Sequence, residues 1–326
     1  MNPFGYVKVD TPAAALSAIG GEPGARFVAG GTNIIDLIKI AVEQPPLLID
    51  INGLPLRAVE RRAGSIYVGS LARLSEVAAD SDVRAHFPLV AIALDQSASP
   101  QLRNMATIGG NLLQRTRCPY FRDVATACNK RSPGSGCGAA GGENRRQAVL
   151  GTSDRCIATH ASDLAVALSA LDATVHVAGA GGAREIAMHD LYRLPGSTPQ
   201  IETSLTSGDL IVGVSLPLLP FAARSTYLKV RDRAQYDFAL ASAAVALDVA
   251  DGRIREARVA LGGVATVPWR SPQAERELAG ASATRASFQR AARAALSGAR
   301  GYGQNDFKIM LAQRTLVRAL EIAAAA

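Results

Sequence analysis

The 326-residue chain has few aromatic residues, which make up 5% of it, and no cluster of Lys and Arg is interleaved with them. Proteins that bind nucleic acid by stacking place aromatic side chains in basic grooves, so we expect no nucleic-acid partner, despite the net charge of +7. The chain also lacks an apolar run long enough to span a bilayer, which predicts no membrane insertion. Residues 1–6 have neither a cationic flank nor an apolar core, so we expect no signal peptide on this chain.

Cysteine is scarce as well, and all four cysteines lie between residues 118 and 156. The rest of the composition is typical of a folded globular protein, with 48% hydrophobic and 19% charged residues. The cysteine segment also carries much of the excess positive charge, which indicates a local anion rather than a large acidic partner. Its basic residues are Arg115, Arg117, Arg122, Lys130, Arg131, Arg145, Arg146 and Arg155.

The first 220 residues alternate between strand and helix patterns, which indicates a domain that combines both. Strands are predicted at the start of 4–20 and at 26–29, 47–51, 65–69, 173–177 and 209–216. Helices are predicted at the end of 4–20 and at 34–39, 74–79, 83–98 and 164–171. We expect one domain over 1–220, with subdomains at about 1–55 and 56–220.

From residue 221 the pattern changes to a strand meander followed by helices. Strands are predicted at 226–231, 239–249 and 253–261, with Asp251-Gly252 as a hairpin turn. Helices are predicted at 271–279, 284–297 and 305–323. This order predicts a smaller α+β domain over 221–326, and the whole chain is assigned to the α+β class.

The first chemical motif is a turn between a strand and a helix. Gly30-Gly31-Thr32-Asn33 follows the strand at 26–29 and precedes the helix at 34–39. Glycines let backbone N–H groups approach an anion, and a helix N-terminus favours negative charge, so this turn could hold a phosphate. It matches neither the dinucleotide-binding fingerprint nor a P-loop. From the residues alone, phosphate binding and an ordinary glycine turn are both open.

Two further motifs flank the cysteines. Ala106-Thr107-Ile108-Gly109-Gly110-Asn111 precedes them, and Ser162-Asp163-Leu164 follows them. We interpret these motifs as two halves of one binding site. An insertion at 113–158 separates them, and we expect this insertion to hold a metal centre.

The cysteine spacing, Cys118-x9-Cys128-x8-Cys137-x18-Cys156, is compatible with several structures. Free core cysteines would be scattered through apolar elements, and disulfides need an oxidising compartment. Structural zinc usually shows paired Cys-x2–4-Cys knuckles, and none is present. A [4Fe–4S] cluster needs four thiolates and tolerates varied spacing, and nearby cations favour thiolates. At this point an iron–sulfur cluster, zinc and no metal all stay open.

Taken together, the motifs resemble the flavin-binding subunit of the molybdenum hydroxylases, the xanthine dehydrogenase and aldehyde oxidoreductase group, over nearly the whole chain. The run 29–33 is similar to that family's first flavin motif, whose backbone wraps the FAD pyrophosphate. The run 106–111 is similar to the second motif, which also contacts FAD. Asp163 lies in a run that resembles the third, whose Asp binds the ribityl or adenosine part. Lys229 lies where the family has a Lys near the isoalloxazine, which would favour the anionic reduced flavin.

The resemblance implies a two-part α/β FAD-binding domain and a set of cofactor-binding residues. Without the resemblance, Lys229 is more simply a solvent-facing strand residue, and Asp163 a residue favoured at a helix N-terminus. The implied set is Arg26, Phe27, Val28, Ala29, Gly30, Gly31, Thr32, Asn33, Ile34, Thr107, Gly110, Asn111, Asp163, Ile211 and Lys229.

The insertion at 113–158 departs from most of the family, which passes from the second motif to the third in a short step. It resembles a periplasmic, bacterial branch of aldehyde oxidoreductases whose flavin subunit holds a [4Fe–4S] cluster in this place. The resemblance therefore implies a [4Fe–4S] cluster on Cys118, Cys128, Cys137 and Cys156. Such a cluster would be either a structural staple or an electron station, and we favour the staple because the family works without it.

By resemblance the chain is the FAD-containing electron-transfer subunit of a molybdenum-dependent aldehyde oxidoreductase, with no catalytic residue for the aldehyde. The implied partners are a [2Fe–2S] subunit and a molybdopterin-containing large subunit in a heterotrimer, with a soluble electron acceptor. The implied location is the periplasm, by co-export with a signal-bearing partner, or the cytoplasm without export. Two alternatives stay open: a self-contained FAD-dependent oxidoreductase and a non-redox, metal-stabilised binding module.

Overall fold

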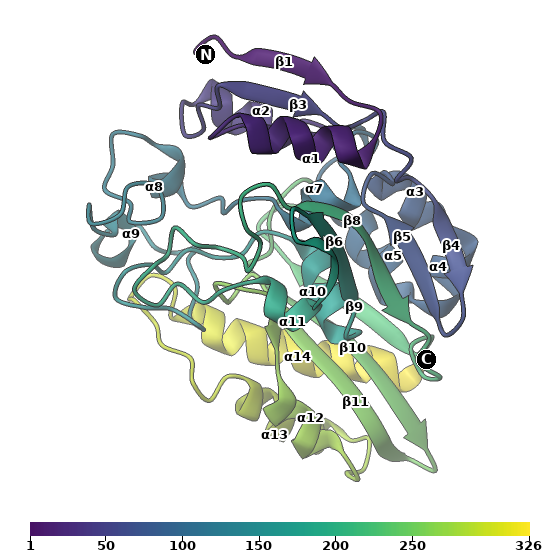
Figure 1. Ribbon diagram of the computed structural model, residues 1–326. Helices are drawn as coiled ribbons and strands as arrows, with labels where there is room; N and C mark the ends of the chain where they lie inside the picture. The colour runs from purple at the N-terminus through teal and green to yellow at the C-terminus, as the bar shows by residue number, and fades with distance from the viewer.

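The computed structural model describes residues 1–326, and its strands form three separate sheets (Figure 1). The N-terminal sheet is parallel, in the order β1-β3-β2, with strands β1 (Gly5–Lys8), β2 (Arg26–Val28) and β3 (Leu47–Asp50). Helices α1 (Pro12–Gly21) and α2 (Ile34–Lys39) connect these strands along the chain. Parallel neighbours need such crossover connections, and the predicted alternation over 4–51 is confirmed.

The central sheet is antiparallel, with its five strands in the order β4-β5-β8-β6-β7. The strands are β4 (Val59–Arg62), β5 (Ser65–Gly69), β6 (Thr174–Gly179), β7 (Gly182–Ala187) and β8 (Leu210–Pro217). Strands β5, β6 and β8 match predicted strands. The edge strands β4 and β7 carry no predictive signal, because most of their side chains are exposed and lack the apolar alternation of a half-buried strand.

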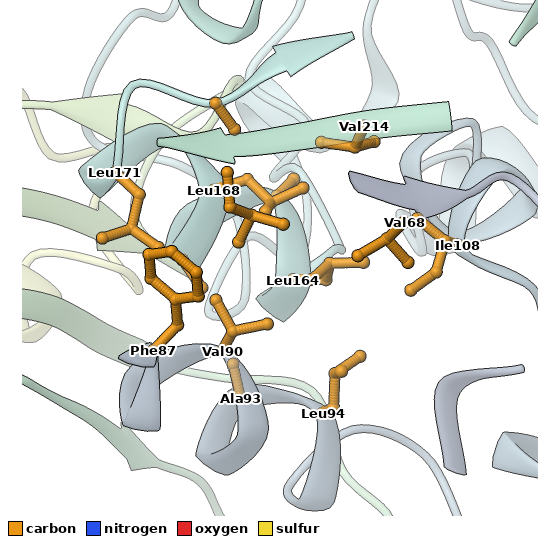
Figure 2. Close-up of a cluster of buried hydrophobic side chains, with 14 of the residues drawn as sticks. Val68, Phe87, Val90, Ala93, Leu94, Ile108, Leu164, Leu168, Leu171 and Val214 are labelled. Carbon is orange, nitrogen blue, oxygen red and sulfur yellow. The ribbon is translucent and has the colours of Figure 1, made fainter. Parts of the chain in front are cut away.

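The largest hydrophobic core joins the central sheet to helices α5 (Pro88–Asp95) and α10 (Asp163–Ala170) (Figure 2). Every residue of α10 is buried, so this helix lies inside the protein and not on its surface. In Figure 2, Val68 and Val214 of the sheet lie on one side of α10, and Val90 of α5 lies on the other. The third motif, at the start of α10, is thereby fixed in the centre of the molecule.

The prediction of one helix over 83–98 is wrong, because the segment forms two helices, α4 (Ser81–His86) and α5. Phe87 lies between them with φ −137° and ψ 61°, outside the helical region. The ring of Pro88 disfavours the helical conformation of the residue before it, and this ends α4. Helix α3 (Leu74–Ala79) matches its prediction.

The C-terminal part has an antiparallel sheet in the order β12-β11-β10-β9, with helices on it. Its strands are β9 (Ser225–Val230), β10 (Ala241–Ala250), β11 (Arg253–Gly262) and β12 (Trp269–Arg270). Its helices are α12 (Pro272–Leu278), α13 (Arg285–Ala295) and α14 (Phe307–Ala325). The predicted meander and three helices are confirmed, and α14, yellow in Figure 1, packs along β9 and β10.

The remaining helices are short, and two of them belong to the cysteine insertion. They are α6 (Pro100–Arg103), α7 (Ile108–Leu112), α8 (Pro119–Arg122), α9 (Gly138–Gly141) and α11 (Met188–Leu191). Figure 1 shows α8 and α9 at one edge of the molecule, away from the three sheets. The Val149 N–H donates to the Val264 carbonyl over 2.8 Å, which ties the insertion to the C-terminal part. No helix combines the length and the apolarity that a membrane crossing needs.

Candidate cofactor sites

A cavity of about 640 Å³ opens where β2, α2, α7 and β8 meet, and its size lies in the range of cofactor pockets. Its lining brings together parts of the chain that are far apart in sequence. Most of the lining lies within 25–37, 107–116, 158–160, 192–193, 200–211 and 266–267, and the other lining residues are Ile19, Glu43, Ile51, Ser70, Leu71 and Lys130. The first and second motifs therefore line the same cavity, whereas no residue of the third motif, 162–164, lines it. The interpretation of the second and third motifs as two halves of one binding site stays a prediction.

The Gly-Gly turn of the first motif lies directly against the chain that leads into the second. A Cβ added to Gly30 would lie 1.9 Å from the carbonyl oxygen of Met105, so only glycine fits this contact. Gly31 has φ +71°, in the left-handed region that glycine adopts without strain. The Arg73 guanidinium donates to the Met105 carbonyl and, over 3.1 Å, to Asn52, which donates to the Ala29 carbonyl over 2.9 Å. These bonds hold the two motifs side by side.

Two buried polar atoms on the cavity wall have no hydrogen-bond partner. They are the amide nitrogen of Asn33 and the hydroxyl of Ser70. A buried polar group without a partner costs about 1–3 kcal/mol, so both atoms favour a polar ligand in the cavity. A nucleotide cofactor carries many acceptors, and its phosphates suit the exposed backbone of a Gly-Gly turn. The residues present therefore fit FAD.

The second motif is joined to the third by side chains. The Thr107 hydroxyl accepts from the Gly110 N–H over 3.3 Å and caps α7. The Ser162 hydroxyl donates to the Asn111 side chain over 2.6 Å and accepts from the Ala165 N–H over 2.9 Å, which caps α10. The side-chain oxygen of Asn111 thereby accepts from Ser162, and this bond holds α7 against α10.

Asp163 and Lys229, predicted to contact the cofactor, contact each other instead of lining the cavity. The Lys229 ammonium lies 2.7 Å from the Asp163 carboxylate and also donates to the Gln96 carbonyl over 3.1 Å. The Tyr227 hydroxyl donates to the second carboxylate oxygen over 2.5 Å, and burial, followed by the charge of Asp163, raises the pKa of Tyr227. The interpretation of Lys229 as a solvent-facing strand residue is wrong, because its side chain is 1% exposed.

Most of the predicted cofactor residues line the cavity. Those that do are Arg26, Phe27, Ala29, Gly30, Gly31, Thr32, Asn33, Ile34, Thr107, Gly110 and Ile211, and those that do not are Val28, Asn111, Asp163 and Lys229. The part that each residue plays toward FAD stays a prediction.

Sequence patterns miss an aromatic pair in the cavity wall. The ring of His160 meets the ring of Tyr192 edge-on, with centroids 4.5 Å apart, and both residues line the cavity. Burial lowers the pKa of His160 to about 4, so its imidazole is neutral at pH 7. Burial also raises the pKa of Tyr192, whose hydroxyl donates to the Leu112 carbonyl over 2.9 Å. Neither residue lies in a motif, and only the tertiary fold brings them together.

A network of ion pairs crosses the same wall. The Arg115 guanidinium lies 2.5 Å from Glu43 and 2.6 Å from Glu202. The Lys130 ammonium lies 3.7 Å from the other oxygen of Glu202. Arg115 and Lys130 belong to the cysteine insertion, so these pairs fasten the insertion to the cavity.

The four cysteines come together around a second, small cavity, and all of them are free thiols. Cys118, Cys128 and Cys156 are buried, and Cys128 pairs with Cys137 in a short antiparallel bridge. No group of three His, Cys, Asp or Glu side chains is arranged to hold a metal ion. The predicted convergence of the four cysteines is present, and a metal on them stays a prediction.

Polar side chains hold the cysteine segments in place. The Asn129 side chain accepts from the Gly134 and Gly136 N–H groups over 3.1 and 2.9 Å and donates to the Arg155 carbonyl over 3.0 Å. The Arg131 guanidinium donates to the Phe121 carbonyl over 2.8 Å. These two residues connect the segments that carry all four cysteines.

The sulfur atoms accept hydrogen bonds that suit a thiolate ligand. The Gln147 side-chain amide donates to the Cys118 sulfur over 3.5 Å, and the Ala158 N–H donates to the Cys156 sulfur over 3.4 Å. Burial raises the pKa of Cys118 to about 11 and also raises that of Cys156, so both are neutral thiols without a metal. Three buried thiols and the half-buried Cys137, with N–H donors to two of the four sulfurs, supply the ligand types of an iron–sulfur cluster.

Comparison with known proteins agrees with this geometry. A family model described as the FAD binding domain in molybdopterin dehydrogenase matches residues 2–219, and one described as the CO dehydrogenase flavoprotein C-terminal domain matches 226–323. The aldehyde oxidoreductase FAD-binding subunit PaoB of Escherichia coli (strain K12) is 48% identical, over 98% of each chain. The glyceraldehyde dehydrogenase medium chain of Sulfolobus acidocaldarius is 28% identical, over 85% of this chain and 81% of its own.

A solved structure has the same fold. Carbon monoxide dehydrogenase from Hydrogenophaga pseudoflava, in a form lacking the Mo-pyranopterin moiety, superposes with a TM-score of 0.78 and 25% identity, over 100% of this chain and 99% of that chain. Fold, cavity and matches define an FAD-binding oxidoreductase subunit. The chain belongs to the family of FAD-binding medium subunits of the molybdenum hydroxylases, as its motifs predict.

Proposed function

We propose that FAD occupies the 640 Å³ cavity, with its pyrophosphate on the Gly-Gly turn. The observation that carries the proposal is that two motifs far apart in the chain line one cavity, in which Asn33 and Ser70 have unpaired polar atoms. Backbone N–H groups of the turn would bind phosphate oxygens, and Asn33 and Ser70 would donate to other acceptors. FAD supplies an electron carrier that takes two electrons singly or together. Three predicted residues would support the site without lining the cavity, by holding α7, α10 and β9 in place. They are Asn111, Asp163 and Lys229.

We propose that Cys118, Cys128, Cys137 and Cys156 hold a [4Fe–4S] cluster. The support is the gathering of all four cysteines around one cavity, with N–H donors to two sulfurs and basic residues nearby. Buried thiols with raised pKa values release their protons when metal binds, so loading should be weaker at low pH. Zinc is the competing occupant, because it too binds four thiolates.

We propose that the chain is the electron-transfer subunit of a heterotrimeric aldehyde oxidoreductase. The support is its 48% identity to an aldehyde oxidoreductase FAD-binding subunit over 98% of both chains. On a molybdenum-containing partner, an aldehyde and water would give a carboxylic acid, two protons and two electrons. This subunit would receive the electrons from a [2Fe–2S] partner and pass them to a soluble acceptor. We place the assembly in the periplasm, by co-export with a partner that carries the signal.

One purification tests the cofactor proposals. The chain is purified anaerobically with its partner subunits, and FAD, iron, sulfide and zinc are measured per chain. We expect one FAD, and four irons beyond those of the [2Fe–2S] partner. Zinc in place of the four additional irons would contradict the proposal of a [4Fe–4S] cluster. A protein without flavin would contradict the proposal that the chain is an FAD-containing subunit.

The remaining alternative is an oxidase that oxidises aldehydes without partners. The chain alone, loaded with FAD, is mixed anaerobically with an aldehyde, and the flavin absorption near 450 nm is followed. We expect no bleaching until the molybdenum and [2Fe–2S] subunits are added. Bleaching by the chain alone would support the self-contained enzyme.

A further inference from the structure

The flavin cavity and the cysteine cavity have a wall in common. Lys130 and Ala158 line both cavities. The Ala158 N–H donates to the sulfur of Cys156, and Lys130 follows Cys128 by two residues. The flavin cavity and the cysteine cavity therefore adjoin each other across Lys130 and Ala158.

Lys130 is held rigidly in this wall. Its ammonium donates to the Pro199 carbonyl over 2.9 Å and lies 3.7 Å from Glu202, and its side chain is 12% exposed. A charge so far removed from water is screened weakly, so it acts over longer distances than a surface charge does.

The charged network around Lys130 contains both signs. Lys130, Arg115 and Arg26 oppose Glu202 and Glu43, with three positive and two negative charges. Loss of the Lys130 charge therefore leaves the wall more negative, and loss of the Glu202 charge leaves it more positive. The two changes have opposite electrostatic effects on both cavities, although both disrupt the same ion pair.

We propose that Lys130 couples the two cofactor sites electrostatically, raising the reduction potential of a flavin on one side and of an iron–sulfur cluster on the other. Reduction adds negative charge to either group, and a nearby fixed cation stabilises the reduced state. Lys130 is a positioning and tuning residue and touches no reacting atom of the aldehyde. The inference rests on the proposed flavin and cluster.

The test is a pair of redox titrations on the complete enzyme with its partner subunits. Dithionite is the reductant, the flavin is followed by absorption, and the cluster by its EPR signal. Four variants are compared with the unaltered protein: Lys130→Met, Lys130→Arg, Glu202→Gln, and Lys39→Met as an exposed control. FAD and iron are measured first in every sample.

Lys130→Met should lower both potentials, Glu202→Gln should raise both, and Lys130→Arg and Lys39→Met should leave them nearly unchanged. We expect about a tenfold change in each reduction equilibrium, which is about 59 mV for the one-electron cluster and about 30 mV for the two-electron flavin. Shifts of the same sign in Lys130→Met and Glu202→Gln would indicate a merely structural role and overturn the inference, as would unchanged potentials. Absence of FAD or of the cluster from the unaltered protein would overturn the proposed function instead.

Discussion

The Lys229 ammonium and the Asp163 carboxylate form a buried ion pair of 2.7 Å, with exposed fractions of 1% and 8% for the two side chains. Lys229 lies on β9 and Asp163 begins α10, so the pair joins the C-terminal sheet to the helix at the centre of the molecule. The Tyr227 hydroxyl and the Ser97 hydroxyl also contact the carboxylate. The carboxylate therefore has all its partners within the protein.

Removal of one member of this pair should destabilise the fold strongly. Lys229→Met leaves the Asp163 carboxylate buried without its cation, and breaking a buried pair in this way costs about 3–5 kcal/mol. The free energy of unfolding is measured in urea for Lys229→Met and for the double variant Asp163→Asn/Lys229→Met. The double variant should recover part of the loss, because no unpaired charge remains.

FAD affinity decides whether Lys229 also acts on the cofactor. If Lys229 only holds the fold, the double variant should bind FAD with close to normal affinity under conditions in which it is folded. A loss of FAD affinity in the folded double variant would instead support the direct contact that the family resemblance implies.

Gly30→Ala should weaken FAD binding, whereas a glycine-to-alanine change in helix α1 should not. The added methyl would meet the Met105 carbonyl at 1.9 Å, so the turn must move away from the second motif. We expect at least a tenfold weaker FAD affinity, about 1.4 kcal/mol, measured by flavin fluorescence. The matched control is Gly20→Ala near the end of α1, where the new Cβ meets nothing within 4 Å and helix propensity improves. Normal FAD binding by Gly30→Ala would show that the Gly-Gly turn is not part of the FAD site.

Much of the site could be predicted from the sequence, because its glycine turn has strict local requirements. The close contact at Gly30 and the positive φ at Gly31 both require glycine, so the sequence of the turn reveals them. The strand before the turn and the helix after it each have a recognisable residue pattern. The walls at His160, Tyr192 and the 200–210 segment have no such signal. Their side chains reach the cavity only through long-range packing, which no local pattern encodes.

The roles of Asp163 and Lys229 show a different limit. A motif identifies the residue but not its partner, and here two residues 66 positions apart neutralise each other. The edge strands β4 and β7 were beyond prediction because an exposed strand needs no apolar alternation. The break between α4 and α5, in contrast, could be predicted from Pro88, because a proline disfavours the helical conformation of the residue before it.

Cys128→Ser should remove the iron and keep the flavin. Cys128 lines the cysteine cavity and does not line the flavin cavity, and a serine hydroxyl is a poor ligand for iron–sulfur clusters. We expect the broad iron–sulfur absorption to disappear while the flavin bands stay. Ser132→Ala, an exposed position in the same loop, should keep both and controls for loop damage. Loss of flavin alone from Cys128→Ser would contradict the ligand assignment.

Lys308 should make stability depend on pH in the alkaline range. Burial, followed by the charges of Arg146 and Arg145, lowers the pKa of Lys308 to about 7, from 10.5 for an ordinary lysine. Its amine donates to the Arg146 and Gln147 carbonyls over 3.0 and 2.8 Å. Between pH 7 and 10.5 the unfolded chain keeps the proton that the folded protein has released. Stability therefore rises with pH across this window, and the cost of burying the charge is fully present below it.

Urea unfolding of the unaltered protein and of Lys308→Met, at several pH values from 6 to 9.5, tests this expectation. Relative to Lys308→Met, the unaltered protein should gain stability above pH 7 by up to about 1.4 kcal/mol per pH unit. Cysteines and tyrosines titrate in both proteins, so their contribution cancels in the difference. Lys39→Met, which removes an exposed lysine, should run parallel to the unaltered protein. A difference between the unaltered protein and Lys308→Met that is independent of pH would mean that Lys308 keeps an ordinary pKa in the fold.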